Sequence, residues 1–198
     1  MYRFIETIQV LHGELINMEY HQVRFERTRR EKLRLRKHPK LLEAIRLPDG
    51  LERARIKCRV TYGKEIELIE YESYGEQKIR SLKLVHSDHL DYSYKYADRS
   101  QLSLLFEQRE NCDDILVVKK NCITDSYVAN VLLWDGREWL TPDTPLLQGT
   151  MRAALLNKGI IRETRITPAD LSGYQKIKLI NAMNDLEHAP EIPMDGIF

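Results

Sequence analysis

Alternation of apolar and polar residues predicts β-strands in the first half of the chain. Strands are expected at residues 3–11, 53–62 (RARIKCRVTY), 65–72 (EIELIEYE) and, as a further candidate, 78–85. Gly63-Lys64 provides the turn between the second and third of these strands. A charged helix is expected over residues 19–37, before the break at residues 47–50 (LPDG). This part of the sequence therefore predicts a helix packed on antiparallel strands.

The second half of the chain mixes apolar strand segments with helical periodicity. Strands are expected at residues 115–118, 128–133 and 175–182, and helices at residues 98–109 and 150–157. Asp135-Gly136 is typical of a hairpin turn, and Thr167-Pro168 is typical of a helix start. The pattern predicts an α+β fold. A small N-terminal domain over residues 1–87 would precede a larger domain of mixed sheet and helices over residues 88–198.

Composition and charge give little reason to expect a polymeric partner or a metal. The 198 residues carry a formal net charge of +1, and residues 24–40 are interpreted as a basic, solvated helix face. No run of about 18 apolar residues is present, and the first ten residues lack the apolar centre of a signal peptide. Cys58, Cys112 and Cys122 show no CxxC spacing. We expect a cytoplasmic protein without a metal site that binds neither nucleic acid nor membrane.

Lys95 is the candidate nucleophile, because it is surrounded by tyrosines in residues 91–99 (DYSYKYADR). If this segment is a strand, Tyr92, Tyr94 and Tyr96 share one face and Lys95 projects from the other. Aromatic neighbours can desolvate an amine, which lowers its pKa and makes it nucleophilic. The alternative is a surface lysine whose aliphatic stem lies over the tyrosines.

The order of motifs around Lys95 resembles the fold-type IV enzymes that depend on pyridoxal phosphate (PLP). This group contains the class IV aminotransferases and the aminodeoxychorismate lyases. Its K-x-x-x-R, T-E-x-x-x-x-N and L-x-G-x-x-R motifs are similar to Lys95–Arg99, Thr124–Asn130 and Leu147–Arg152. Residues 4–8 (FIETI) are similar to its F-E-T strand with one residue inserted, and residues 21–24 (HQVR) match its H-x-x-R helix. Residues 180–183 (INAM) are similar to a late Asn-Ala/Ser segment.

The resemblance implies PLP as cofactor, joined to Lys95 through a Schiff base, with Lys95 also moving protons as general base and acid. The implied cofactor-binding residues are Lys95, Arg24, Asp125, Asn130, Gly149, Thr150 and Met151. The helix start at Gly149 would favour the phosphate, and Arg24 would add a charged contact. Asp125 stands where the family has glutamate, which pairs with the pyridine nitrogen. The structural alternatives are a plain helix start, an exposed arginine and an aspartate that caps a turn.

The residues implied for substrate binding are Glu6, Thr7, Arg59, Tyr62, Asn181 and Ala182. Glu6 and Thr7 are neighbours on one strand, so only one of them can face the substrate. Arg59 and Tyr62 are candidates for binding a carboxylate, with a strand-surface arginine and a packed tyrosine as the alternatives. Asn181 and Ala182 would offer polar or backbone contacts.

The resemblance implies two reactions, of which the motifs favour the first. A lyase would release pyruvate and 4-aminobenzoate, a folate precursor, from 4-amino-4-deoxychorismate. An aminotransferase would act on branched-chain or D-amino acids. The larger domain would be the cofactor-binding one, with a D-amino acid aminotransferase-like fold. The family also implies a homodimer, with the active site between the two domains and near the dimer interface.

A third reading is a PLP-binding homologue without turnover, and it rests on two departures from the family pattern. Aspartate at position 125 is one methylene shorter than the family's glutamate. The chain also begins almost on the F-E-T-like strand, where family members carry an additional strand and a glycine loop. We expect a substrate pocket that is more open or is filled by the partner subunit.

Overall fold

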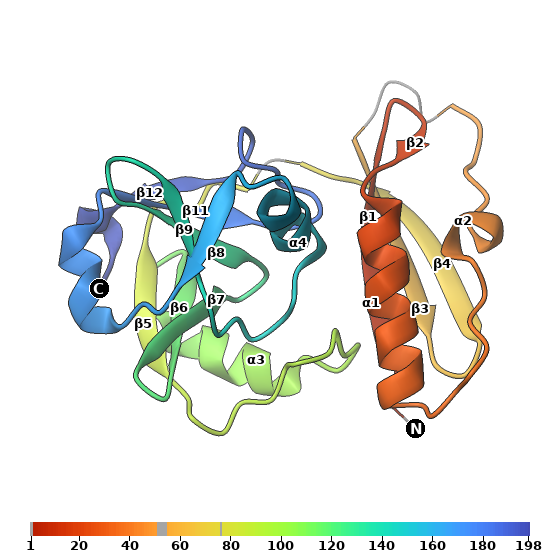
Figure 1. The fold of residues 1–198 in the computed structure, drawn as a ribbon, viewed down its shortest axis with the longest axis horizontal. Helices are drawn as coiled ribbons and strands as arrows, with labels where there is room; N and C mark the ends of the chain where they lie inside the picture. The colour runs from red at the N-terminus through yellow and green to blue at the C-terminus, as the bar shows by residue number, and fades with distance from the viewer. Residues whose placement is uncertain (1, 51–54, 76) are drawn as a thin grey trace. The chain divides into compact units, whose positions relative to one another are not determined.

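The structure is a computed structural model that describes residues 2–50, 55–75 and 77–198. The chain divides into two compact units, residues 1–76 with 94–98 and residues 77–93 with 99–198. Each unit contains its own sheet, and helices accompany both sheets (Figure 1). The α+β fold predicted from the sequence is confirmed.

The first unit is an antiparallel sheet packed against a long helix (Figure 1). Its strand order is β2-β1-β3-β4. The elements are β1 (Phe4–Leu11), β2 (Glu14–Leu15), α1 (Met18–Glu31), α2 (Leu41–Ala44), β3 (Ile56–Tyr62) and β4 (Ile66–Ser73). Phe4 and Ile8 of β1 and Val60 of β3 form the core with Phe25 of α1. The predicted strands at residues 3–11 and 65–72 are confirmed. The strand predicted at residues 53–62 begins at Ile56 in the structure. Its predicted start at Arg53 and Ala54 lies outside the described residues.

The helix α1 ends earlier than the charge pattern over residues 19–37 predicts. It stops at Glu31, and Arg34 takes a positive φ of 57°, which a helix does not contain. The buried side chain of Arg29 donates a hydrogen bond of 3.1 Å to the carbonyl of Gly63, in the turn between β3 and β4. Packing against this turn holds the end of the helix, and the sequence pattern does not reveal it.

Residues 24–40 are only in part the solvated face that the sequence analysis predicts. Arg24 and Arg29 are 7% and 4% exposed, whereas Arg30 and Lys32 are exposed to solvent. The prediction is therefore wrong for two of the arginines, because each finds oxygen acceptors in the interior of the first unit.

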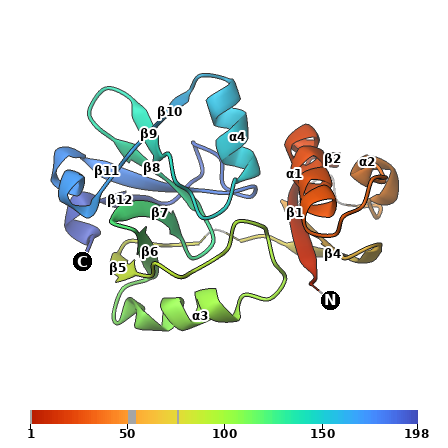
Figure 2. The same ribbon diagram turned by 60° about the horizontal axis from the view of Figure 1, so that its bottom comes forward.

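The second unit is built on a strand assembly ordered β10-β9-β8-β7-β6-β5, with β11 paired to β8 and β12 to β11. Its strands are β5 (Leu82–His86), β6 (Asp114–Lys119), β7 (Cys122–Ser126), β8 (Asn130–Trp134), β9 (Trp139–Pro142), β10 (Ile161–Thr164), β11 (Lys176–Ile180) and β12 (Glu191–Pro193). Its helices are α3 (Ser100–Phe106), α4 (Thr150–Asn157) and the 3-10 turns Glu107–Arg109, Pro168–Gly173 and Met194–Gly196. The helices α3 and α4 lie on different sides of the strands (Figure 2).

The second unit contains most of the differences from the predicted elements. The strand candidate at residues 78–85 is β5, which pairs in parallel with β6 and does not extend the first sheet. The short strands β7, β10 and β12 are not predicted, because their sequences carry little periodicity. The same holds for the single-turn helix α2 of the first unit. The hairpin at Asp135-Gly136 is confirmed by the antiparallel pairing of β8 and β9. Thr167 also forms the predicted cap, although the helix that follows is a 3-10 helix.

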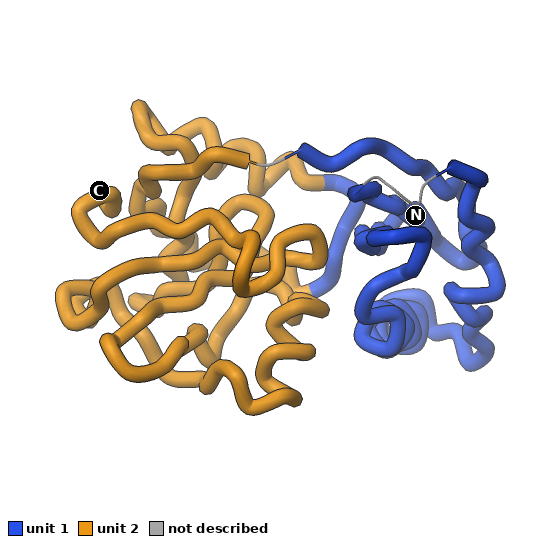
Figure 3. Tube along the Cα trace, turned by 90° about the horizontal axis from the view of Figure 1, so that it is seen from above, with its two compact units in different colours: residues 1–76, 94–98 blue, residues 77–93, 99–198 orange. Residues whose placement is uncertain are grey.

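The segment that carries Lys95 leaves the second unit and joins the first (Figure 3). The Ile5 amide donates to the Lys95 carbonyl at 2.9 Å, and the Ala97 amide donates to the Arg3 carbonyl at 2.9 Å. These bonds hold the segment along the edge of β1, with a single bridge between Phe4 and Tyr96. The domain division predicted at residues 87/88 stays a prediction, whereas the compact units separate at residues 76/77.

The segment around Lys95 is not a strand that presents three tyrosines on one face. Tyr94 and Tyr96 pack around Phe4 in the first unit. Tyr92 belongs to the second unit, where its ring lies 5.6 Å from the guanidinium of Arg99. The strand hypothesis is wrong because the segment passes between the units after a turn, in which Ser93 donates two hydrogen bonds to Asp91.

Within the described ranges, the chain has no helix that is both long and apolar enough to cross a membrane.

The core of the second unit should respond to truncation far more than its surface does. Leu116 is fully buried in β6, whereas Leu104 is 62% exposed on α3. Leu116→Ala should lower the free energy of unfolding by about 2–5 kcal/mol through lost burial and a residual cavity. Leu104→Ala should change it by less than about 0.5 kcal/mol. Both tryptophans lie in this unit, so tryptophan fluorescence during urea unfolding measures the difference. Equal effects of the two substitutions would contradict the described packing.

Candidate active site

A buried cluster of charged groups joins β1 to α1 in the first unit. Glu6 and His21 are completely buried, and Arg24 is 7% exposed. Arg24 donates to both carboxylate oxygens of Glu6, from Nε at 3.0 Å and from Nη2 at 2.5 Å. Nδ1 of His21 lies 2.7 Å from Oε2 of the same carboxylate. The prediction that Glu6 contacts substrate stays a prediction, and the structure places its carboxylate between an arginine and a histidine.

Electrostatics fix the protonation of this cluster. Burial alone would raise the pKa of Glu6, but the charge of Arg24 and the hydrogen bonds from His21 and Arg24 lower the pKa to about 2. Burial lowers the pKa of His21, and the nearby cations Arg24 and Lys95 lower it further. Glu6 is therefore ionised while His21 is neutral. The proton of the imidazole must lie on Nδ1, where it donates to the carboxylate.

Lys95 is brought to this cluster by the backbone of β1. Its carbonyl accepts the amide proton of Ile5, the residue next to Glu6. Its side chain is partly buried, and its charge adds a small contribution to the lowered pKa of His21, which burial chiefly causes. The structure thus brings together three of the residues predicted from the sequence, namely Glu6, Arg24 and Lys95.

Asp125 is the central group of the second unit. It is 5% exposed in β7. Its Oδ2 accepts the amide proton of Leu147 at 2.9 Å, and its Oδ1 accepts a proton from Nδ2 of Asn130 at 2.9 Å. Burial raises the pKa of Asp125 to about 7, and the hydrogen bonds from Leu147 and Asn130 with the charge of Arg152 offset only part of that effect. A carboxylate in such a setting gains stability from a cationic ligand, and a protonated pyridine nitrogen fits that requirement.

Gly149 brings the start of α4 close to the Asp125 site. A Cβ atom built on Gly149 would lie 1.8 Å from Oδ1 of Asn130, so no other residue fits there without displacing this side chain. Asn130 also donates to the carbonyl of Leu147 at 2.9 Å, which ties the loop before α4 to β8. Thr150 and Met151 follow in the first turn of the helix, where N–H groups lack helical partners. The predicted set Asp125, Asn130 and Gly149 is therefore contiguous, and its helix start suits a phosphate dianion.

The four substrate candidates in β1 and β3 are divided between the two faces of the first sheet. Tyr62 is fully buried and packs on Phe4 and Phe25, on the face that carries α1. Thr7 and Arg59 are register partners on β1 and β3. The alternating burial of β3 places Arg59 on the face opposite Tyr62. Arg59 and Tyr62 therefore cannot bind one carboxylate together, and the structure groups Arg59 with Thr7.

Asn181 organises its own loop after β11. Its Oδ1 accepts the amide protons of Met183 at 2.9 Å and Asn184 at 3.0 Å, and its Nδ2 donates to the carbonyl of Val128 at 3.4 Å. Ala182 lies in the same turn and is partly buried. Contact of Asn181 and Ala182 with substrate stays a prediction.

Three contributors to these clusters are not predicted as site residues. His21 and Arg99 belong to motifs that the sequence analysis recognises, so the motifs contain a usable signal. Arg99 lies over the ring of Tyr127 at 4.4 Å and donates to the Tyr127 carbonyl, which braces the turn after Asp125. The third contributor is the backbone amide of Leu147, for which a side-chain pattern gives no signal.

The raised pKa of Asp125 predicts a pH-dependent loss of stability. Because its pKa is about 7 in the folded chain and 3.8 is the ordinary value, the folded state holds a proton that the unfolded state releases between these values. The free energy of unfolding therefore falls as the pH rises through this window. Asp125→Asn should remove the effect. Its stability relative to the parent should rise by about 3–4 kcal/mol between pH 4 and pH 8.

Urea unfolding at a series of pH values measures this difference. Asp143→Asn, at an exposed carboxyl of the same unit, is the control. A stability difference between Asp125→Asn and the parent that is constant with pH would contradict the buried carboxyl.

Comparison with known proteins shows the relationship of the chain. The model of the amino-transferase class IV family matches residues 70–187. An uncharacterised protein of Haemophilus influenzae is 40% identical over 188 residues, which cover 94% of this chain and all of that one.

Two solved structures have the same fold. A protein of Haemophilus somnus named as a "putative 4-amino-4-deoxychorismate lyase" superposes with a TM-score of 0.89 and 34% identity, over 94% of this chain and 98% of its own. A hypothetical aminotransferase of Mycobacterium tuberculosis in a PLP-bound form has a TM-score of 0.77 and 18% identity, over 96% and 80% of the two chains. With the family match over more than half of its length, the chain belongs to the class IV aminotransferase family.

Proposed function

We propose that the protein is a PLP-dependent lyase that converts 4-amino-4-deoxychorismate to pyruvate and 4-aminobenzoate. The observation that carries the cofactor is the buried carboxylate of Asp125, which accepts hydrogen bonds from the Leu147 amide and from Asn130 beside the helix start at Gly149. PLP supplies an electron-poor ring that takes up charge from a substrate carbon. Family membership and the order of the motifs support the same assignment.

The residues proposed to hold the cofactor have distinct physical tasks. Asp125 stabilises a proton on the ring nitrogen, because its carboxylate gains a cationic partner in place of a costly buried charge. The start of α4 at Gly149–Met151 offers amide donors and a helix dipole to the phosphate. Arg24 adds positive charge, and its bidentate pair with Glu6 fixes the orientation of the guanidinium.

Lys95 is proposed to bind the cofactor covalently through its amine and then to move the proton of the reaction. The amine accepts the proton from the substrate carbon that bears the amino group. The ether bond between the substrate ring and its enolpyruvyl group then breaks, which makes the ring aromatic. The same proton is returned to the methylene carbon of the departing group, so that pyruvate forms and the atoms balance.

The name of the Haemophilus somnus relative favours the lyase over the aminotransferase, since that chain is 34% identical over nearly the full length of both. The K-x-x-x-R motif at Lys95–Arg99 and the Asn-Ala-Met segment support the same choice. The second candidate is an aminotransferase for branched-chain or D-amino acids. It is favoured by the family description that matches residues 70–187.

Lys95→Ala tests the cofactor linkage. The parent protein should be yellow after incubation with PLP, lose its visible band on borohydride treatment and carry the label on Lys95. The variant should keep its fold but fix no label, because no amine replaces that of Lys95. Absorbance and peptide mass spectrometry measure both results, and Lys158→Ala, at an exposed lysine after α4, is the control. A label on another lysine would disprove the assignment.

Direct assay decides between the two reactions. Incubation with 4-amino-4-deoxychorismate should release pyruvate and 4-aminobenzoate in equal amounts, measured by coupled absorbance and chromatography. Lys95→Ala should reduce the rate by at least about 1,000-fold, since it removes the group that moves the proton. Turnover of an amino acid and keto acid pair without pyruvate release from aminodeoxychorismate would establish the aminotransferase instead. PLP binding with neither reaction would establish a non-catalytic homologue.

A further inference from the structure

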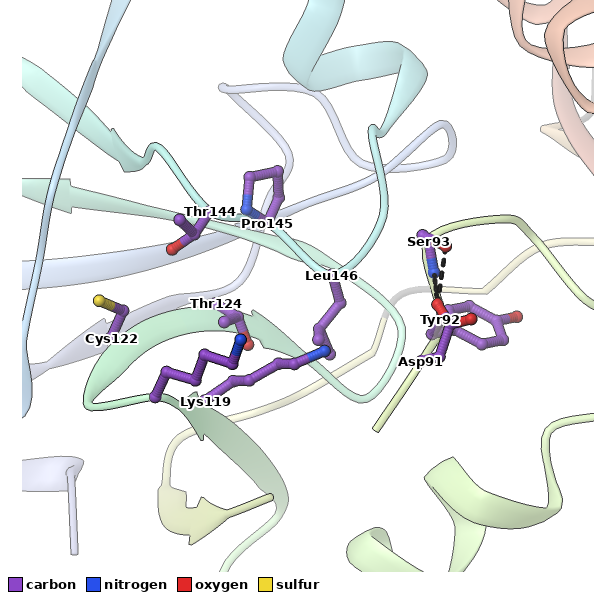
Figure 4. Close-up of a pocket in the computed structure, with 10 residues that line it drawn as sticks. Asp91, Tyr92, Ser93, Lys119, Cys122, Thr124, Thr144, Pro145 and Leu146 are labelled. Carbon is purple, nitrogen blue, oxygen red and sulfur yellow. Dashed lines mark hydrogen bonds between the residues drawn. The ribbon is translucent and has the colours of Figure 1, made fainter. Parts of the chain in front are cut away.

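A pocket with a volume of about 260 Å³ lies in the second unit, and none of the residues proposed to bind PLP lines it. Its walls come from residues 91–93, from the end of β6 and the beginning of β7 at residues 119–124, and from the loop at residues 144–146 (Figure 4). The volume lies just below the range of about 300–1,000 Å³ that drug-sized ligands occupy. The pocket therefore suits a smaller molecule.

The polar lining of this pocket favours an anion. Lys119 and Lys120 both line it, and the ammonium of Lys119 is partly buried and donates to the carbonyl of Leu90. That bond uses one of the three protons that an ammonium group can donate. The carboxylate of Asp91 accepts two hydrogen bonds from Ser93, at 3.1 Å and 2.7 Å, which satisfies it locally. Two cations against one such carboxylate leave the lining with net positive charge.

The remaining lining is apolar enough to hold a ring. Pro145 and Leu146 contribute hydrophobic surface, and Figure 4 shows these side chains around the same space as Lys119 and Thr124. The hydroxyl of Thr124 donates to the carbonyl of Val117 at 2.8 Å, so it offers a ligand only lone pairs. A cationic end beside an apolar wall matches a molecule that has both a carboxylate and a ring.

We infer that this pocket is a second ligand site, which binds a small carboxylate with an apolar ring. The carboxylate pairs with Lys119 and Lys120, and the ring lies against Pro145 and Leu146.

Chain connectivity couples this second site to Asp125. Thr124 immediately precedes Asp125 in β7, and Leu146 immediately precedes Leu147, whose amide donates to Asp125 at 2.9 Å. A ligand in the pocket therefore contacts Thr124 and Leu146, which are the chain neighbours of Asp125 and Leu147. Through them it changes the environment of Asp125. This step rests on the proposed function. Its product 4-aminobenzoate has both a carboxylate and a ring, so the pocket would be a site where the product regulates the enzyme.

Binding is tested with 4-fluorobenzoate as the probe, observed by ¹⁹F NMR on the full chain without PLP and again after loading with PLP. The parent should bind the probe saturably in both forms. Lys119→Gln/Lys120→Gln should weaken binding at least about 10-fold, because it removes both charges that pair with the carboxylate. Thr144→Trp, at an exposed position on the rim, should weaken it similarly by filling the space. Lys158→Gln should bind like the parent.

The outcomes separate this site from the proposed function. Probe binding to the protein without PLP tests the second site even if the protein does not bind PLP. Absence of saturable binding by the folded parent, or affinity equal to that of the parent in both the double lysine variant and Thr144→Trp, would overturn the site. In the loaded form, saturating probe should shift the visible band in the parent and not in Thr144→Trp. A band that does not move in the parent would overturn the coupling to Asp125.

Discussion

A carboxylate in a protein interior must find positive charge or hydrogen-bond donors, and the buried carboxylates Glu6 and Asp125 show the two ways in which this chain meets that constraint. Arg24 lies against Glu6, and the pKa of Glu6 falls to about 2. Asp125 accepts from the Leu147 amide and the Asn130 side chain, and burial raises its pKa to about 7 despite these hydrogen bonds. The first carboxylate is a structural ion pair, while the second is stabilised by any cation brought to it. This asymmetry is what makes Asp125 suited to a protonated ring nitrogen.

The edge of β1 fixes the position of the segment that carries Lys95. A lysine in a loop has many conformations, but two backbone hydrogen bonds hold this loop along the strand that carries Glu6. The amine then shares the electrostatic environment of His21 and Arg24. His21 carries no charge at neutral pH, and its Nδ1 proton is donated to the carboxylate of Glu6.

The second unit uses a few short elements for two purposes. The strand β7 carries Asp125 toward the candidate cofactor site and Thr124 toward the pocket of the inferred second site. The loop at residues 144–146 lines that pocket and continues into Leu147 and Gly149. Because adjacent residues of one strand and one loop serve both places, a small displacement at one is transmitted over covalent bonds to the other. No long-range mechanism is needed for such coupling.

The sequence by itself determined the family, the α+β class and the identity of most residues in both clusters. Motifs such as H-x-x-R and L-x-G-x-x-R were informative because they contain residues with local structural tasks, for example the glycine that lies against Asn130. The long alternating run at β3 was readable because one face of that strand is buried and the other is not. The early end of α1, the parallel pairing of β5 and the transfer of residues 94–98 to the first unit were not readable.

Those features depend on contacts between segments that are distant in the sequence. The side chain of Arg29 reaches Gly63, and the carbonyl of Lys95 accepts from Ile5. The protonation states of Glu6 and Asp125 also depend on the tertiary structure. Both are acidic residues in β-strands, and only the donors that folding brings to each carboxylate decide which one is ionised and which one holds its proton.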